Sequence, residues 1–166
     1  MKIIKAHKKV SRLVTEQDLD RVYKESEEIY SMLNKKIGNF HSFYAIAHPQ
    51  VEDKDPLRFF VLNNLTEEFR SWNVVVINPV IINHTKQEIP SKEGCATFSS
   101  LPETVVKRFH KIQVELNFLE FQRSIIDTEY KPVMGKRIKL DMSGKIAKIF
   151  QHEIDHLNAK YIYDII

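Results

Sequence analysis

The N-terminal part of the chain has the apolar spacing of an amphipathic helix over residues 16 to 37. Apolar and small side chains recur there at intervals of three and four, which places them on one helical face. The positions are Leu19, Val22, Tyr23, Ser26, Ile29, Tyr30 and Leu33. Thr15 stands before the pattern as a candidate cap, and Gly38 follows it as a stop signal. We therefore predict a helix that buries one face against the rest of the fold.

The middle of the chain carries strand patterns. Residues 59–62 and 72–82 are rich in Val, Ile and aromatic side chains, as is typical of strands. Pro79 limits the hydrogen-bond ladder of the second segment. Over residues 112–118 apolar and polar side chains alternate, which predicts a strand with one buried face.

The last part of the chain predicts a hairpin and a second helix. Residues 121–142 are more polar and contain Pro132 and Gly135, which favours a loop or hairpin that returns to the sheet. Helical spacing resumes from about 145 to 158, with Ser143 as a candidate cap. The order helix, strands, helix predicts an α+β fold. A length of 166 residues suits a single domain over 1–166.

Composition and charge narrow the class of protein. Apolar residues make up 43% and charged residues 28% of the chain, as in ordinary globular proteins. The net charge is only +3 and the basic residues are scattered among carboxylates, which disfavours nucleic-acid binding. No apolar run approaches the length of a membrane helix, and no secretory signal follows the N-terminus. With a single cysteine and hence no internal disulfide, we expect a cytoplasmic protein without membrane or direct nucleic-acid partners.

The second predicted helix contains an HExxH string at residues 152–156. One helical turn separates His152 from His156, so both imidazoles project from one face and can bind one metal ion. Glu153 lies beside them, where a carboxylate can act as a general base without binding the metal. Asp155 is expected to be a solvated carboxylate. The competing interpretation is a pair of surface histidines on an amphipathic helix.

A catalytic metal site needs a third protein ligand, and the sequence after the motif offers none of the usual kind. A metzincin pattern fails at Ala159 and Ile162, and no glutamate follows Glu153. Cys95 is the best upstream candidate because thiolate binds zinc and ferrous iron strongly, although a lone cysteine is more often a small buried hydrophobic residue. The histidines that stay open as alternatives are His41, His48, His84 and His110, together with the carboxylates.

Three strings of the chain resemble the peptide deformylase family. Residues 93–97 (EGCAT) resemble its EGCLS, residues 151–158 (QHEIDHLN) match its QHEIDHLNG, and residues 43–50 (FYAIAHPQ) stand where GxGLAAxQ would. The resemblance implies a hydrolase of translation and N-terminal protein processing, which removes the formyl group from the formyl-methionine of nascent peptides. It also implies antiparallel or mixed β-sheets around a central helix that carries HExxH.

The resemblance assigns roles to individual residues. The metal ligands that it implies are Cys95, His152 and His156. Glu153 would activate a metal-bound water, and the Gln50 side chain and the Ala96 backbone N–H would be the oxyanion donors. Substrate-binding residues are expected at Tyr44, Ile46, Glu93, Gly94 and Ile149. The implied cofactor is one divalent metal ion, Fe²⁺ in the cell, with Zn²⁺, Ni²⁺ or Co²⁺ as substitutes in purified protein.

The string at residues 43–50 departs most from the family. Phe43 and Ala45 replace its glycines and His48 its second alanine, which predicts an altered cleft, with His48 as a solvated loop histidine. The chain also stops without the C-terminal tail of many bacterial members. These features are expected of a phage or minor bacterial member. The protein is expected to work in the cytoplasm, which is the host cytoplasm if it belongs to a phage, with transient proximity to the ribosome. The alternatives are a deformylase-like, peptide-binding metalloprotein with lost or altered activity and a general metallopeptidase with other ligands.

Overall fold

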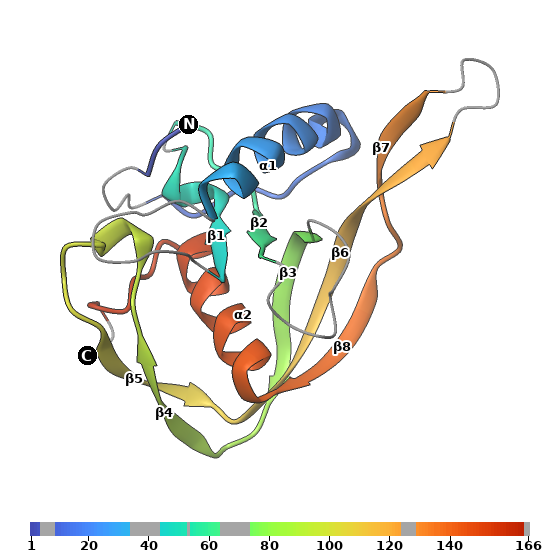
Figure 1. Ribbon diagram of the computed structural model, residues 1–166. Helices are drawn as coiled ribbons and strands as arrows, with labels where there is room; N and C mark the ends of the chain where they lie inside the picture. The colour runs from blue at the N-terminus through green and yellow to red at the C-terminus, as the bar shows by residue number, and fades with distance from the viewer. Residues whose placement is uncertain (4–8, 34–43, 53, 64–73, 124–128, 165–166) are drawn as a thin grey trace.

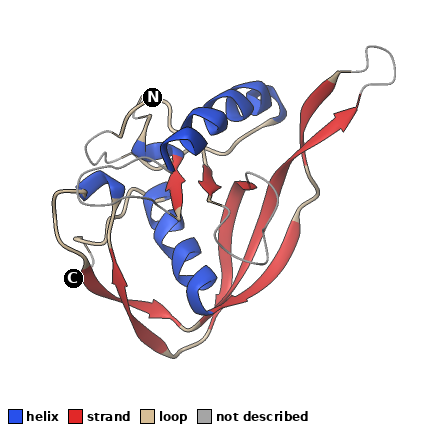
Figure 2. Ribbon diagram, viewed as in Figure 1, coloured by secondary structure: helices blue, strands red, loops and turns tan. Residues whose placement is uncertain are grey.

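Helices stand near both ends of the chain and strands lie between them (Figure 2), in a computed structural model that describes residues 1–3, 9–33, 44–52, 54–63, 74–123 and 129–164. The elements are η1 (Glu16–Asp18), α1 (Leu19–Leu33), β1 (Ala45–Ala47), η2 (His48–Gln50), β2 (Phe59–Leu62), β3 (Val74–His84), β4 (Glu88–Glu93), η4 (Ala96–Phe98), β5 (Thr104–Phe109), β6 (Lys111–Arg123), β7 (Tyr130–Met134), β8 (Ile138–Ser143) and α2 (Gly144–Leu157). Each η element is a short 3-10 turn. This order confirms the predicted α+β class.

Two sheets surround helix α2. A six-stranded sheet has the order β1-β2-β3-β6-β7, and β8 pairs with β6 beside β7. Strands β4 and β5 form a separate two-stranded sheet, and α2 lies between the two sheets (Figure 1). Every pairing between the named strands is antiparallel. No helix in the described ranges is long and apolar enough to cross a membrane.

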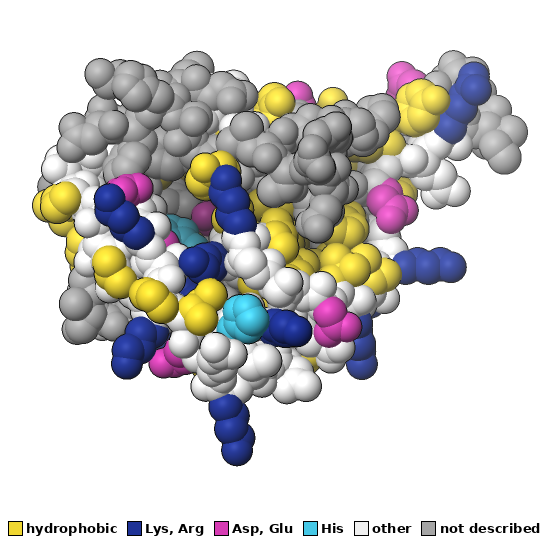
Figure 3. Space-filling view, turned by 60° about the horizontal axis from the view of Figure 1, so that its bottom comes forward, with side chains coloured by type: hydrophobic (Ala, Val, Ile, Leu, Met, Phe, Trp, Pro, Cys, Tyr) yellow, Lys and Arg dark blue, Asp and Glu magenta, His cyan; other side chains and the backbone are white. Residues whose placement is uncertain are grey.

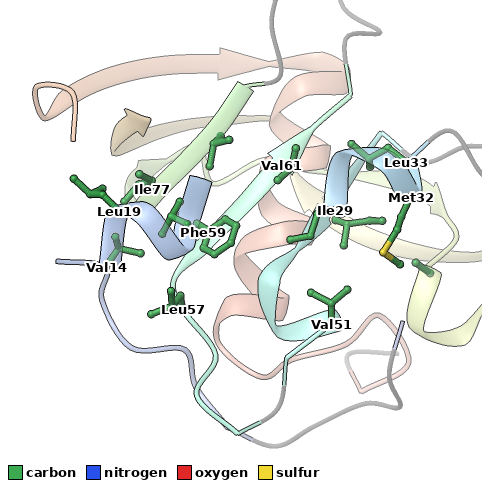
Figure 4. Close-up of a cluster of buried hydrophobic side chains, with 14 residues drawn as sticks. Val14, Leu19, Ile29, Met32, Leu33, Val51, Leu57, Phe59, Val61 and Ile77 are labelled. Carbon is green, nitrogen blue, oxygen red and sulfur yellow. The ribbon is translucent and has the colours of Figure 1, made fainter. Parts of the chain in front are cut away.

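The six-stranded sheet carries one helix on each face. In β2, Phe59 and Val61 pack into the cluster with α1, whereas Phe60 and Leu62 pack into the cluster with α2. Figure 4 shows the first cluster, in which Ile29 of α1 lies near Phe59 and Val61. Because successive side chains of a strand point to opposite faces, a strand covered on both sides needs apolar residues throughout. This explains why all four residues of β2 are buried and apolar.

The predicted N-terminal helix is present, but its first three residues form a 3-10 turn instead of α-helix. The turn η1 precedes α1, and the Asp18 carboxylate accepts a hydrogen bond from the backbone N–H of Thr15 at 2.8 Å. Val22 and Ile29 are fully buried as predicted, but Tyr23 is exposed at 42%. Its ring makes an edge contact with Phe121 of β6. The predicted helix end at Gly38 lies outside the described residues.

Pro79 interrupts the ladder of β3 as predicted. The pairing between β3 and β6 shifts register between Ile77 and Val80, and Asn78 there has a φ of 51°. Asparagine tolerates this left-handed conformation better than most residues. Its side chain donates to the carbonyl of Val14 and accepts from the Val14 backbone N–H, both at 2.9 Å. The bulge therefore ties the N-terminal segment to the sheet.

The polar stretch after residue 120 forms the predicted hairpin. Strands β6 and β7 continue beyond the body of the molecule as a projecting arm (Figure 1), and β8 returns along β6. The alternation predicted for residues 112–118 ends at Asn117, which is buried while Phe118 is half-buried. Asn117 donates to the carbonyl of Gly135 and accepts from Arg137, so these bonds compensate the burial of a polar side chain.

Replacing Asp18 with asparagine is expected to lower the free energy of unfolding at neutral pH by about 1 kcal/mol. The hydrogen bond from Arg12 holds the pKa of Asp18 well below its ordinary value, so its carboxylate favours the folded state at every pH above the unfolded pKa of about 4. This contribution is lost as the pH falls through the lower, folded pKa. Urea unfolding of both proteins between neutral and acidic pH should show the difference shrinking below about pH 4, whereas a pH-independent difference would contradict this origin.

Candidate metal centre and active site

Helix α2 carries the two histidines of the HExxH string, His152 and His156, on the face opposite its apolar core contacts. Phe150 and Ile154 pack into the core with the six-stranded sheet. Ser143 takes the extended N-cap conformation, but its side chain makes no capping hydrogen bond. Gly144 begins the helix with a φ of 61°, a conformation that glycine adopts without strain.

Cys95, His152 and His156 come together as predicted. Their ligand atoms all lie within 4.8 Å of one another. The Sγ of Cys95 is 3.4 Å from Nε2 of His156, which is 3.0 Å from Nε2 of His152. Two of these ligands come from one turn of α2, and the third comes from the loop between β4 and η4. This cluster is the only one of its kind in the described ranges.

The cluster fits a divalent metal ion. Metal bonds of about 2.0–2.3 Å in a tetrahedron separate donor atoms by about 3.3–3.6 Å, close to the 3.4 Å and 3.0 Å that separate Nε2 of His156 from the other two donor atoms. Burial lowers the pKa of His152, but the sulfur of Cys95 and the carboxylate of Glu93 outweigh it and raise this pKa to about 10. The surroundings of His152 therefore attract positive charge, as a metal site requires.

A buried ion-pair group supports His152. Its Nδ1 lies 2.9 Å from Oε2 of Glu93, which leaves Nε2 for the metal. Arg108 is only 4% exposed and donates to both oxygens of Glu93 and to Asp155. Although burial acts to raise it, the pKa of Glu93 is held at about 2 by Arg108 and His152. Asp155 is thus an ion-pair partner of Arg108, and the expectation of a solvated carboxylate is wrong.

Glu153 has the surroundings of a general base. It is 4% exposed, and among the described residues its Oε2 has no hydrogen-bond partner. Burial raises the pKa of Glu153 to about 7, against the opposite influence of His152. A carboxyl group with a pKa near the working pH can both accept and return a proton.

Gln50 lies beside Cys95, close to the position that the resemblance implies. Its Oε1 accepts the backbone N–H of Ala47 at 2.9 Å. Its Nε2 donates to Oγ1 of Thr97 at 3.2 Å and lies 3.8 Å from Sγ of Cys95. These contacts turn the amide donor toward the metal ligands. Ala96 begins η4 directly after Cys95. It lines the cleft that opens over the metal ligands.

A cleft of about 770 Å³ opens over these groups. Figure 3 shows histidine and acidic side chains within a hollow and lysine and arginine side chains around it. The predicted site residues that line the cleft are Tyr44, Gln50, Glu93, Gly94, Ala96, Ile149, His152 and Glu153. The Nζ of Lys145 lies over the Tyr44 ring at 3.6 Å, a cation–π contact at the cleft wall.

Two predictions about the segment before Gln50 need correction. Ile46 was expected to bind substrate, but its side chain is fully buried in the cluster with α1, on the other side of the sheet. Its strand neighbours Ala45 and Ala47 belong to the cluster with α2, as the alternation of a strand requires. His48 is not solvated: it is fully buried. Phe43 lies outside the described residues.

The other candidate histidine ligands do not belong to the metal cluster. His84 is exposed and stacks on Phe109. His110 lines the cleft, and His48 contacts Glu25 of α1. His41 lies outside the described residues. Cys95 is therefore the third ligand that the described residues offer.

Substituting Glu93 with glutamine is expected to weaken metal binding by about 10- to 100-fold. The change removes the negative charge that accepts from Nδ1 of His152, and it leaves Arg108 with one carboxylate partner fewer. Metal affinity measured against a competing chelator checks this. Glu103→Gln, at the cleft margin in an exposed ion pair with Lys92, serves as the control and should bind like the unaltered protein.

Known proteins share both the sequence pattern and the fold. A peptide deformylase of Staphylococcus epidermidis is 30% identical over 99 residues, which are 58% of this chain and 46% of that protein, so the match spans about half of that relative. A peptide deformylase of Thermotoga maritima is 28% identical over 146 residues, 86% of this chain and 75% of the relative. The crystal structure of peptide deformylase from Thermotoga maritima has a TM-score of 0.70 at 26% identity, over 96% of this chain and 89% of that one.

The family model described as polypeptide deformylase matches residues 1–166. This match includes all three strings on which the resemblance rests and the HExxH helix with its cysteine partner. The chain therefore belongs to the polypeptide deformylase family.

Proposed function

We propose that the protein is a metal-dependent hydrolase that removes the N-formyl group from the formyl-methionine of nascent peptides and releases formate. The observation that carries this proposal is the buried carboxyl of Glu153 beside the three donor atoms of Cys95, His152 and His156, at a cleft. The proposed ion is Fe²⁺ in the cell, which is the metal that the family resemblance implies; a thiolate and two imidazoles suit ferrous iron and zinc alike. The proposed location is the cytoplasm, with transient proximity to the ribosome.

The residues of the site divide the proposed reaction between them. A divalent ion bound by the three ligands would supply Lewis-acid activation of water. Glu153 takes a proton from the water as its oxygen attacks the formyl carbon. When the carbon–nitrogen bond breaks, Glu153 gives this proton to the departing amine. Formate and a free N-terminus result.

Two donors face the negative charge that develops on the formyl oxygen. The Nε2 of Gln50 is held beside the metal ligands by its contacts with Thr97 and Ala47. The backbone N–H of Ala96 is proposed as the second donor. Donors fixed in advance lower the barrier because they need no reorganisation during the reaction.

The cleft is proposed to bind the peptide in an extended form. The backbone of the peptide would run past Tyr44 and Gly94, and its methionine side chain would enter an apolar pocket that Ile149 helps to line. Glu93 lines the same cleft, but its carboxylate is committed to Arg108 and His152. Its proposed role is therefore to support the metal ligand.

Formate release from formyl-Met-Ala-Ser by anaerobically purified, Fe²⁺-loaded protein tests the proposal. The matched control is acetyl-Met-Ala-Ser, for which the free N-terminal amine is measured because hydrolysis of this peptide would give acetate and no formate. Its additional methyl group should prevent turnover if the site is built for a formyl group. Formate release at the level of a protein-free blank, with metal and peptide both bound, would contradict the hydrolase and favour a peptide-binding metalloprotein.

A further inference from the structure

His48 is a fully buried histidine outside the metal cluster, and both of its ring nitrogens have partners. Its Nδ1 accepts the backbone N–H of Leu57 at 2.8 Å. Its Nε2 lies 2.6 Å from Oε2 of Glu25 in α1. The ring also stacks on Phe59, with 4.6 Å between the centroids. His48 therefore connects η2 to α1 through Glu25, and to the segment just before β2 through Leu57.

The partners fix the proton on this ring. A backbone N–H can only donate, so Nδ1 of His48 must present its lone pair to Leu57. The ring proton then sits on Nε2 and is donated to the Glu25 carboxylate. A neutral ring with this tautomer gives the Leu57 N–H an acceptor and the Glu25 carboxylate a donor, and it leaves neither ring nitrogen of His48 without a partner. The orientation of the ring is consequently determined by Glu25 and Leu57 together.

The turn that carries His48 also carries Gln50. The carbonyl of His48 accepts the backbone N–H groups of Val51 and Glu52, both at 3.0 Å, which closes the turn around Gln50. The amide of Gln50 is held at one end by Ala47 of the preceding strand. A rotation or shift at His48 would therefore move the Gln50 donor relative to the metal ligands.

Glu25 is itself held in place. Its Oε1 accepts from Nε of Arg21 at 3.0 Å, so its two oxygens have separate partners. Arg21 also pairs with Asp55 at 2.7 Å, in the loop that leads to β2. The carboxylate that orients His48 is thus anchored to the same loop region as Leu57.

We propose that Glu25 and His48 form a positioning pair that fixes the amide of Gln50 for oxyanion stabilisation. This inference rests on the proposed function. Neither residue lines the cleft over the metal ligands, so both act through Gln50 rather than on the substrate. Because His48 stands where the family string has alanine, the pair is a feature of this chain rather than part of the family pattern.

Variants of Glu25 test the pair. Glu25→Ala removes the acceptor for Nε2 of His48 and is expected to lower kcat by about 10-fold with KM changed by less than about 2-fold, since Gln50 acts mainly in the transition state. Glu25→Gln keeps an acceptor oxygen and should retain at least about half of kcat. Glu27→Gln, at an exposed position of the same helix, is the control for altered charge. Equal losses in Glu25→Gln and Glu25→Ala would contradict the hydrogen-bond role.

Variants of His48 separate its two bonds. His48→Gln can place an amide nitrogen near Nε2 and keep the donor to Glu25, whereas His48→Asn can place an oxygen near Nδ1 and keep the acceptor for Leu57. If Glu25 orients the turn, His48→Gln should retain more of kcat than His48→Asn. The reverse order would show that the bond to Leu57 alone holds the turn.

A double-mutant cycle with Gln50 distinguishes positioning from general stability. In a Gln50→Ala background, Glu25→Ala should change kcat by less than about 2-fold, because the group through which it acts is gone. A loss of about 10-fold in both backgrounds would overturn the proposal. Metal content and melting temperature are measured for each variant, so that altered loading or unfolding is recognised.

A readout that needs no turnover keeps this inference separate from the proposed function. The side-chain amide resonances of Gln50 are assigned by their loss in Gln50→Ala. They should shift in Glu25→Ala and stay close to their original positions in Glu25→Gln. Unchanged resonances in Glu25→Ala would overturn the positioning pair, whereas a shift in a protein that releases no formate would overturn only the hydrolase.

Discussion

Glu153→Ala is expected to abolish formate release, with a loss of at least about 10³-fold, while the protein still binds metal. The variant removes the carboxyl that takes the proton from water and returns it to the amine. None of the three donor atoms of the metal cluster belongs to Glu153. Turnover of formyl-Met-Ala-Ser and metal content per chain, measured on the same anaerobic preparation, check both parts of this prediction.

Glu153→Gln is the matched control that keeps the size and shape of the side chain and removes only its ability to accept a proton. It conserves the volume of a side chain that is buried beside the cleft, and it should be as inactive as Glu153→Ala because an amide cannot accept and return a proton at neutral pH. Release of formate by either variant at the unaltered rate would show that Glu153 is not the base.

Cys95→Ser is expected to weaken metal binding by at least about 100-fold. A metal ion binds cysteine as the thiolate, whereas a serine hydroxyl stays neutral at neutral pH. The substitution therefore removes the sulfur donor that stands 3.4 Å from Nε2 of His156. Metal retained per chain after dialysis against a chelator measures the effect, and formate release should fall in parallel.

His110→Asn is the control for Cys95→Ser. His110 lines the same cleft but does not belong to the donor cluster, so this variant should keep its metal. If Cys95→Ser instead retained metal as well as the unaltered protein does, the ligand set would be different, as in the alternative of a general metallopeptidase.

The HExxH helix and its cysteine were predictable because their information is local. Helical periodicity alone places His152 and His156 on one face, and the string around Cys95 is short and contiguous. The same holds for β2, whose bounds agree with the predicted 59–62. Its uniform run of apolar side chains reflects burial on both faces.

The ion pairs of Arg108 with Glu93 and Asp155 beside the metal centre were not predicted, because they join residues that are distant in the sequence. In the sequence Arg108 is one of several scattered basic residues, yet its buried guanidinium bridges Glu93 and Asp155, which lie 15 and 47 residues away along the chain. Its alternation with the buried Val106 is a weak signal. Strands β4 and β5 were also missed, since their mixed charged sequences have little apolar periodicity and they are ordered mainly by pairing with each other.

The errors at Ile46 and His48 have one physical origin. The family string indicates which residues lie near the cleft, but not which face of β1 each side chain occupies. Because side chains alternate along β1, Ile46 points into the core. His48 is buried beside Glu25, a partner 23 residues away that the local sequence does not indicate.

Helix α2 serves two purposes at once, because one face fills the core and the other supplies two of the three metal donors. A ligand that binds only the folded state stabilises that state, by about 2.7 kcal/mol when present at about 100 times its dissociation constant. The unfolded chain would lose the pairing of Cys95 with this helix and hence the complete donor set. The free energy of metal binding is therefore part of the free energy of folding, and the intact fold and the loaded centre are thermodynamically linked.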